Sequence, residues 1–449
     1  MKFFNKAALA FAVASICYIP AISQAGVSAE EAAKLKTTLT PLGAEKAGNA
    51  DGSIPAWDGK SAPQVAKLNT GHSADPYAAE KPLFFIDANN SGQYVDKLSQ
   101  GTIELMKKYP SFRVDVYPTH RTAAAPRYVY ENTYTNATRA SLGEDGEVKN
   151  AFGGVPFPIP KSGEEVIWNH ILHPRISSSE FGLKNVVGSS NGRWTIATRA
   201  ENNNQSPYYA RSGNAEKWSG DYLLARFVNT DPPFKAGEAL VIRDNVSLVN
   251  SRQAWQYLVG QRRVRRAPTV AYDTPDFVAS GANYFDEVIG FYGSPDRYSW
   301  KLLGKKEMYI PYNTNGFQAT PMDDALVPFH FNPDKVRWEL HRVWVVEATV
   351  AAGKRHVLPK RTFYFDEDTW AVSMIDGYDA EGKLWRSSYV MPTVEPDYPI
   401  VIADTTFVYD LQAKTFSCVQ CFNEEYFRVV DDKPNSFFTG ASMGASGLR

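Results

Sequence analysis

Cys418 and Cys421 are spaced C-x-x-C near the end of a chain of 449 residues. A thioredoxin-like redox site places this motif where a strand meets a helix, whereas here it follows a strand-like stretch, residues 401–411. A zinc site would need two further ligands, and none of the seven histidines has a paired spacing beside these cysteines. We therefore predict a structural role, as a local disulfide or as two free thiols.

Histidines and acids elsewhere do not form a catalytic motif. The chain contains no H-E-x-x-H pair, Walker loop or Rossmann fingerprint. His170 and His173 are three residues apart, but no third metal ligand is visible and Pro174 ends their helix. The acids at 164–165 are explained by a helix cap, and those at 366–368 by a turn. We predict no catalytic residue, no metal site and no cofactor, with an unrecognised hydrolase as an alternative.

Four arginines stand within the five-residue segment 262–266. If the backbone is extended, Trp255, Tyr257, Arg263 and Arg265 share one face, because side chains alternate along a strand. Guanidinium groups bind anions through paired hydrogen bonds, so we hypothesise that Arg263 and Arg265 hold an anionic headgroup at the rim of an apolar cavity. The alternative is a solvated sheet edge whose arginines pair with nearby acids and discourage aggregation.

Large aromatic side chains are concentrated between residues 336 and 391. Four strand-like runs lie there, at residues 340–350, 355–365, 369–378 and 383–390. The short breaks between them allow only antiparallel neighbours, which predicts a meander. Both faces carry large apolar groups and must be covered by helices or by a ligand. Core packing explains any single aromatic, but the collection predicts a cavity lined by Trp344, Phe363, Phe365 and Trp370.

Other elements follow from periodicity and from the composition, which is 13% aromatic with 31 Gly and 28 Pro and so favours strands and turns. Capping boxes at Ser28 and Ser162 open two predicted helices, which end at Pro41 and Pro174. A third helix is predicted between residues 92 and 110. Alternating patterns predict strands at residues 128–138, 193–199, 222–229, 239–249 and 253–259.

The N-terminus has the form of a secretory signal. Two lysines precede an apolar run at residues 7–19, and residues 23–25 (Ser-Gln-Ala) form a small-x-small cleavage pattern. The run is too short to cross a bilayer, which needs roughly 20 residues, and no later segment of that length lacks a charge. We predict an exported mature chain without a transmembrane helix, in which the two cysteines pair. Cys17 offers a lipoprotein alternative, but Ile16 does not fit a lipobox.

The overall charge excludes one class of partner. Lys plus Arg total 48 against 49 Asp plus Glu, a formal net charge of -1. Nothing in this balance draws the protein toward nucleic acid, and we predict no nucleic-acid partner.

Three segments resemble a known family: residues 39–49 (LTPLGAEKAGN), 260–268 (GQRRVRRAP) and 340–347 (LHRVWVVE). On these, the mature chain resembles the Gram-negative periplasmic family called domain of unknown function thirteen twenty-nine, which is often labelled outer-membrane lipoprotein-sorting-like. Its last third, with FYFDEDTW at 363–370, is similar to periplasmic lipoprotein-localisation carriers. The resemblance implies a β-rich α+β fold: a large, curved, half-open antiparallel sheet with helices covering its concave face.

The expected organisation is a signal peptide, residues 1–25, and one carrier-like domain, residues 26–449. Within that domain we expect helices and loops that wrap the sheet (26–125), a first set of strands (126–266), an irregular connection (267–335), the meander (336–411) and a C-terminal tail with the two cysteines (412–449).

These predictions favour a non-catalytic periplasmic carrier for a lipid, a lipoprotein acyl chain or a sterol-like molecule. Exposing some sixteen methylenes to water costs about 13 kcal/mol, so such a molecule crosses an aqueous compartment slowly unless a protein covers it. The alternative is an adaptor for an envelope transporter or an outer-membrane protein. A carrier predicts a continuous apolar cavity, whereas an adaptor predicts a filled core and an exposed patch.

Overall fold

One open sheet of 16 strands organises the chain in the computed structural model, which describes residues 26–446. Its main path runs through β1 (Phe84–Ile86), β2 (Val114–Val116), β14 (Trp338–Val350), β15 (Lys360–Asp366), β16 (Val372–Tyr378), β17 (Leu384–Val390), β20 (Thr406–Asp410), β21 (Thr415–Cys421), β5 (Ser178–Gly188), β6 (Trp194–Gln205), β7 (Asp221–Asp231), β8 (Ala239–Asn245), β9 (Arg252–Leu258) and β10 (Arg263–Arg266). β11 (Tyr298–Pro311) also pairs with β14, and β22 (Phe427–Val429) with β5. The predicted signal peptide lies outside the described residues.

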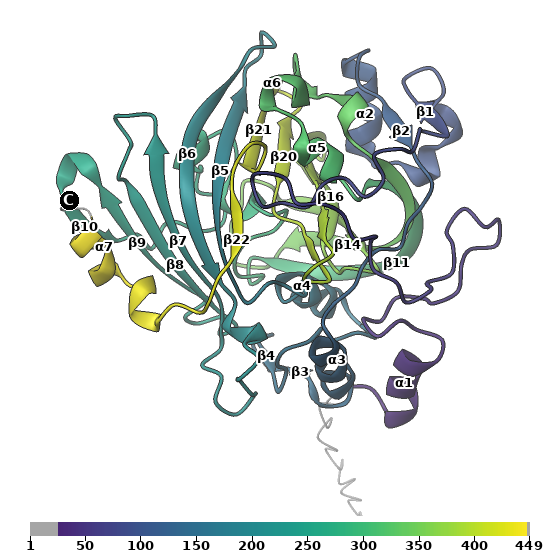
Figure 1. Ribbon diagram of the computed structural model, residues 1–449, viewed down its shortest axis with the longest axis horizontal. Helices are drawn as coiled ribbons and strands as arrows, with labels where there is room; N and C mark the ends of the chain where they lie inside the picture. Colours follow the sequence, from purple (N-terminus) through teal and green to yellow (C-terminus); the bar gives the residue numbers. More distant parts are fainter. Residues whose placement is uncertain (1–25, 447–449) are drawn as a thin grey trace, which may run out of the picture.

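The sheet is strongly curved and its two end strands do not meet (Figure 1). Among the described strands, pairing is antiparallel except for a single parallel contact between β2 and β14. The expected large, open, predominantly antiparallel sheet is therefore confirmed. Within residues 26–446, no helix has the length and hydropathy needed to span a bilayer.

The meander is confirmed in β14 to β17, which pair in sequence order. In its last hairpin, Asp379 opens the turn and Gly382 closes it with φ +76°, a left-handed conformation that glycine adopts without strain. The connection expected to be irregular, residues 267–335, is corrected in part. It contains β11, a strand of 14 residues that covers the outer edge of β14.

The seven α-helices of the described residues are α1 (Ala29–Ala33), α2 (Gln100–Lys108), α3 (Arg127–Arg139), α4 (Gly163–Ile171), α5 (Asn315–Ala319), α6 (Met322–Ala325) and α7 (Gly440–Ser446). The cap at Ser28 is present, with Glu31 completing the box, and Ser162 accepts the Glu165 N–H. The helix expected over residues 92–110 is shorter, because Ser99 caps α2 and two 3-10 turns precede it.

The strand predicted at residues 128–138 is wrong, because this segment is the helix α3. Its buried residues are Val129, Thr133, Asn136 and Ala137, a spacing of three to four that matches a helical face. Packing of this face therefore overrides the strand preference of its tyrosines and threonines. The strands predicted at 193–199, 222–229, 239–249 and 253–259 correspond to β6 through β9.

In the half of the sheet formed by β5 to β10, the two faces have different covers. One face, which we call the strap face, carries Asn202, Phe227, Leu240 and Gln256 in register, and the segment 267–292, the strap, lies across it. The opposite tail face carries Val241, Tyr257 and Trp255. The C-terminal segment covers it with Phe438 and Met443. Each face of this half is therefore covered over at least part of its length.

Candidate binding cavities

Two cavities lie next to each other on the strap face. The first has a volume of about 40 Å³ and the second about 70 Å³. Both are lined from the same three strands at positions two residues apart: Phe181 and Leu183 on β5, Asn204 and Asn202 on β6, and Leu223 and Ala225 on β7. Residues two apart on a strand point to one face and lie roughly 7 Å from each other. The cavities are therefore successive hollows along one trough.

The second cavity is mainly apolar. Its floor is the strap face, with Leu183, Ala225, Phe227, Leu240 and Ile242, and its roof is the strap, with Val278, Phe285, Val288 and Tyr292. Polar groups reach it from Asn185, Asn202, Asp276 and Gln420. A hollow with apolar walls and few polar groups binds by burial of area and selects loosely among hydrophobic molecules.

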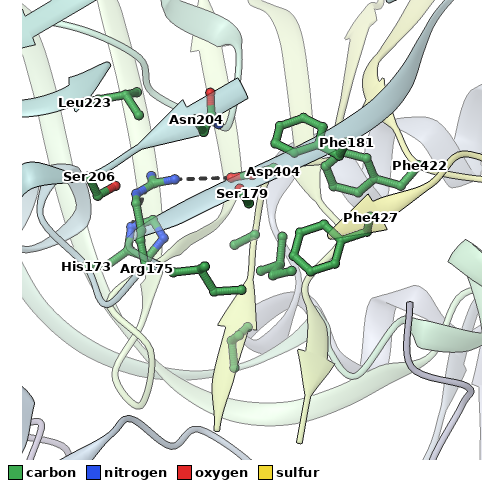
Figure 2. A pocket seen from close by; sticks show the side chains of 14 residues that line it. His173, Arg175, Ser179, Phe181, Asn204, Ser206, Leu223, Asp404, Phe422 and Phe427 are labelled. Atoms are coloured by element: carbon green, nitrogen blue, oxygen red, sulfur yellow. Dashed lines mark hydrogen bonds and ion pairs between the residues drawn. The ribbon is translucent and has the colours of Figure 1, made fainter. Parts of the chain in front are cut away.

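The first cavity combines an apolar wall with a charged corner (Figure 2). Phe181, Phe422 and Phe427 lie on one side, and Arg175 faces them. The Arg175 guanidinium donates to Asp404 Oδ1 at 3.2 Å, and both side chains are mostly buried. This corner is the only part of the two cavities' described lining that holds an arginine.

Protonation at this corner is set by burial. Burial raises the pKa of Asp404, although Arg175 opposes that rise. Burial and the charge of Arg175 lower the pKa of the nearby His173 well below its usual range. His173 is therefore a neutral imidazole at pH 7, and the charged groups of this corner are Arg175 and its partner Asp404.

The strap is held unequally at its two ends. Near its C-terminal end, Asp286 pairs with the buried Arg361, and Glu287 accepts two bonds from Arg386 at 2.7 and 3.0 Å. Its tip, residues 276–283, is bound to the rest of the protein through backbone carbonyls: Lys235 Nζ donates to Phe277 O at 3.2 Å, Thr198 Oγ1 to Val278 O at 2.9 Å, and Arg386 to Ala282 O at 2.8 Å. Ion pairs therefore hold the C-terminal end of the strap, whereas among the described residues no ion pair holds residues 276–283.

The four meander aromatics predicted to line a cavity belong to a buried hydrophobic cluster, and their role in binding a ligand remains a prediction. Phe363, Phe365 and Trp370 are fully buried in the cluster that also holds α4, and Trp344 stacks on Trp370 with ring centroids 6.2 Å apart. None of the four lines the two trough cavities. Their hydrophobic contacts are with neighbouring protein groups, as helices such as α4 cover this face.

The arginine segment does not continue β9, which corrects the expected alignment. The turn at Val259–Gln261 reverses the chain, and β10 pairs back on β9 with Val264 opposite Tyr257 and Arg266 opposite Trp255. Trp255 and Tyr257 therefore lie on the tail face, under the C-terminal segment, whereas Arg263 and Arg265 lie on the strap face. Both arginines are exposed and lie outside the two cavities, so their predicted headgroup role remains a prediction.

Cys418 and Cys421 are joined as a disulfide at an irregularity of β21, where Gln420 has φ +55°. Both residues are fully buried, so neither sulfur is accessible to a redox partner. His170 is also structural, since its Nδ1 accepts the Val372 N–H at 3.1 Å and its Nε2 meets Phe291 O at 3.3 Å.

A G-x-S-x-G sequence occurs at residues 440–444. It opens the C-terminal helix α7, and Ser442 donates to the carbonyls of Phe437 and Thr439. A nucleophile elbow requires this motif between a sheet strand and a helix, so the segment lacks that context.

A buried group of His341, Asp366 and Asp368 has potential metal-ligand atoms within 4.8 Å of one another. Protein groups already bind these side chains. Arg121 donates to both oxygens of Asp368 at 2.7 and 2.9 Å, Thr369 donates to Asp366, and His341 bonds Glu339 at 3.1 Å. The arginine neutralises charge that a metal ion would otherwise compensate, so we interpret the group as an internal ion network.

Sequence reasoning missed the residues that form the trough. Arg175 follows the end of a helix and Asp404 lies in a loop, about 230 residues away along the chain, and no motif connects them. One signal was available on β5, a strand of 11 residues in which Phe181, Leu183 and Val187 are apolar and separated by an even number of positions. That alternation predicts a strand with one apolar face.

Comparison with known proteins assigns the chain to a family. The family model described as "Protein of unknown function (DUF1329)" matches residues 85–444, and the chain belongs to this family. The uncharacterized protein PA3922 of Pseudomonas aeruginosa is 41% identical over 444 residues, which cover 95% of each chain.

Two solved structures are among those similar to this chain. A DUF1329 family protein from Desulfovibrio piger has 13% identity and a TM-score of 0.41, over 60% of this chain and 91% of that one. The LolA superfamily protein NE2245 from Nitrosomonas europaea has 10% identity and a TM-score of 0.36, over 62% of this chain and 98% of that one.

Proposed function

We propose that this protein is a non-catalytic periplasmic carrier that holds a hydrophobic molecule in the trough between the strap and β5 to β8. The observation that carries the proposal is the line of two cavities at successive positions of β5, β6 and β7. Such a line matches an elongated ligand, such as an acyl chain or a sterol-like molecule, better than a compact polar one.

The two cavities differ in polarity, and this difference predicts how a ligand is oriented in the trough. The apolar second cavity suits the hydrocarbon part, and the Arg175 corner of the first cavity suits an anionic or hydrogen-bonding end. A guanidinium that is largely removed from water binds such an end more strongly than an exposed one. The proposed cargo is therefore an amphiphile with one polar end.

Loading requires the roof to move. Each cavity is far smaller than the roughly 300 Å³ of typical ligand sites. Burial of each methylene contributes about 0.8 kcal/mol, so a long chain supplies free energy that can offset the loss of the hydrogen bonds of the strap tip. We infer that the strap opens at residues 276–283 and stays anchored at Asp286 and Glu287.

Two substitutions of alanine by leucine test this proposal. Ala225 lines the second cavity, and Ala239 lies on the opposite face of the neighbouring strand. Ala225→Leu fills the hollow, so we expect binding of a fluorescent fatty acid to weaken by about tenfold or more, the equivalent of roughly two buried methylenes. Ala239→Leu is the matched control and should retain binding, with thermal unfolding of both variants measured alongside. Equal affinity in Ala225→Leu and the unchanged protein would contradict the proposed site.

One observation favours an adaptor role as a second candidate. β1 is an end strand of the sheet, and Leu83, Phe84, Phe85 and Val95 are large apolar residues exposed around it. An exposed apolar edge is a surface on which an extended segment of a partner can add a strand. An envelope transporter or an outer-membrane protein could supply that segment.

A further inference from the structure

Two loops lie together at one end of the strap half of the sheet. The first, residues 232–238, joins β7 to β8, and the second, residues 259–262, joins β9 to β10. Ala239 pairs with Tyr257, which brings the loops to the same end, and a Cβ placed on Gly237 would lie 3.6 Å from Val259. Figure 1 shows β9 and β10 at the left margin of the molecule. We call this pair of loops the tip.

The tip exposes apolar side chains. Phe234 is 76% exposed and Val259 is 37% exposed. An aromatic ring in water at a loop end is costly unless another surface covers it. A docking surface would explain why Phe234 and Val259 are exposed.

A group of arginines adjoins the tip, with Arg262 in its second loop and Arg263, Arg265 and Arg266 along β10. Arg262, Arg263, Arg265 and Arg266 are all exposed, and among the described residues no carboxylate oxygen lies within 4.0 Å of their guanidinium nitrogens. Their described ring contact is Arg266 over Trp255, at 5.7 Å. Asp231 and Glu238 flank the first loop, yet neither pairs with these arginines. In a chain of net charge -1, this is a local concentration of positive charge.

We propose that the tip docks on an anionic phospholipid surface, with Phe234 and Val259 entering the interfacial region and the four arginines binding lipid phosphates. Exposed apolar residues with cations beside them are the combination that holds a protein at such a surface, and neither feature alone gives stable attachment. Guanidinium groups bind phosphate oxygens in pairs, which suits arginine better than lysine for this contact.

The tip is also connected to the roof of the trough. Lys235, next to Phe234, donates the hydrogen bond that holds the strap tip at Phe277, and β10 leads directly into the strap. Docking would therefore place the opening end of the trough against the membrane. This connection rests on the proposed function, whereas the docking itself requires no cargo.

Flotation with lipid vesicles tests the docking. The mature protein is mixed with vesicles of phosphatidylcholine alone or containing about one quarter phosphatidylglycerol. We expect binding only to the anionic vesicles and a steep loss with added salt. Arg262→Asn/Arg263→Ser should weaken binding about 30-fold, since each basic group at an anionic surface contributes about a factor of five. Phe234→Ser should weaken it about tenfold.

Matched controls use residues away from the tip. Val249 is 83% exposed on the loop at the other end of β8, so Val249→Ser removes an equally exposed apolar group. Arg193→Ser/Arg355→Ser removes two exposed arginines elsewhere. Retained binding by both controls supports the assignment. Failure of the unchanged protein to float with anionic vesicles, or an equal loss in the controls, overturns it, and neither result depends on fatty acid binding by Ala225→Leu.

Discussion

His341 shows how single residues control the charge balance of the interior. Its ring bonds Glu339 at 3.1 Å and lies near Asp366 and Asp368. Burial alone would lower the pKa of His341, but hydrogen bonds and charges from Asp368, Glu339 and Asp366 outweigh burial and raise it to about 9. A folded-state pKa above the unfolded value means that protonation stabilises the fold. This stabilisation is complete below the unfolded pKa and is lost as the pH rises through the folded value.

The first prediction concerns this histidine. We expect the free energy of unfolding, measured with urea, to fall by up to roughly 3 kcal/mol as the pH rises from about 6 to 10. His341→Gln carries no titrating ring, so the fall attributable to this site should be missing from its pH profile. Parallel pH profiles for the two proteins would show that His341 is not the responsible group.

At the level of residues, the sequence predicted the chemical character of the side chains better than their location in the fold. The apolar and aromatic character of Phe363, Phe365 and Trp370 was visible, but only the fold shows that neighbouring groups fill the space around them. The face of Arg263 and Arg265 depends on a turn in which Arg262 adopts φ +48°, a conformation that a non-glycine residue rarely takes. Local patterns cannot foresee such a reversal.

Among the elements, the strap is anchored by ion pairs at Asp286 and Glu287, whereas among the described residues no ion pair holds the strap tip, residues 276–283. Asp276 is the first residue of the strap tip, where it accepts bonds from Val278 N and Asn283 Nδ2 at 3.1 and 3.2 Å. Burial raises the pKa of Asp276 to about 6, although those bonds oppose the rise. The protonated carboxyl is therefore favoured when the strap is closed, and its ionisation above that pH favours opening.

The second prediction is a pH-dependent opening of the strap. Hydrogen exchange of residues 267–292, corrected for intrinsic rates, should show about tenfold lower protection near pH 8 than near pH 5. Asp276→Asn should abolish the difference, because its side chain stays neutral. Asp273→Asn, on the same strap, is the control and should preserve it. A pH difference that survives in Asp276→Asn would exclude this carboxyl as its origin.

Element prediction succeeded where local pattern and packing agree. The meander follows from alternation and short turns, and its strands occur as expected. Residues 127–139 illustrate the opposite case: tyrosine and threonine favour strands, yet the helix buries Val129 and Thr133 on one side. β11 was missed because its middle is partly exposed, with Leu303 51% exposed at a register shift, so alternation is broken there.

For the whole molecule, the two halves of the sheet are covered by different segments. In the meander half, helices and aromatic residues pack against both faces of the sheet. In the half from β5 to β10, the covering segments are the strap and the C-terminal tail, and the trough lies under the strap. The open sheet was predictable from family resemblance and strand patterns. The trough was not, because residues about 230 positions apart in the chain build it.

The carrier account is tested most directly by native mass spectrometry of the mature protein purified without detergent, followed by solvent extraction. We expect a bound mass that extraction recovers as an amphiphile with a long hydrocarbon part. Ala225→Leu should lose this mass, and Ala239→Leu should retain it. The account would be contradicted if the spectrum showed only the mass of the polypeptide and the extracts contained no lipid or sterol-like compound.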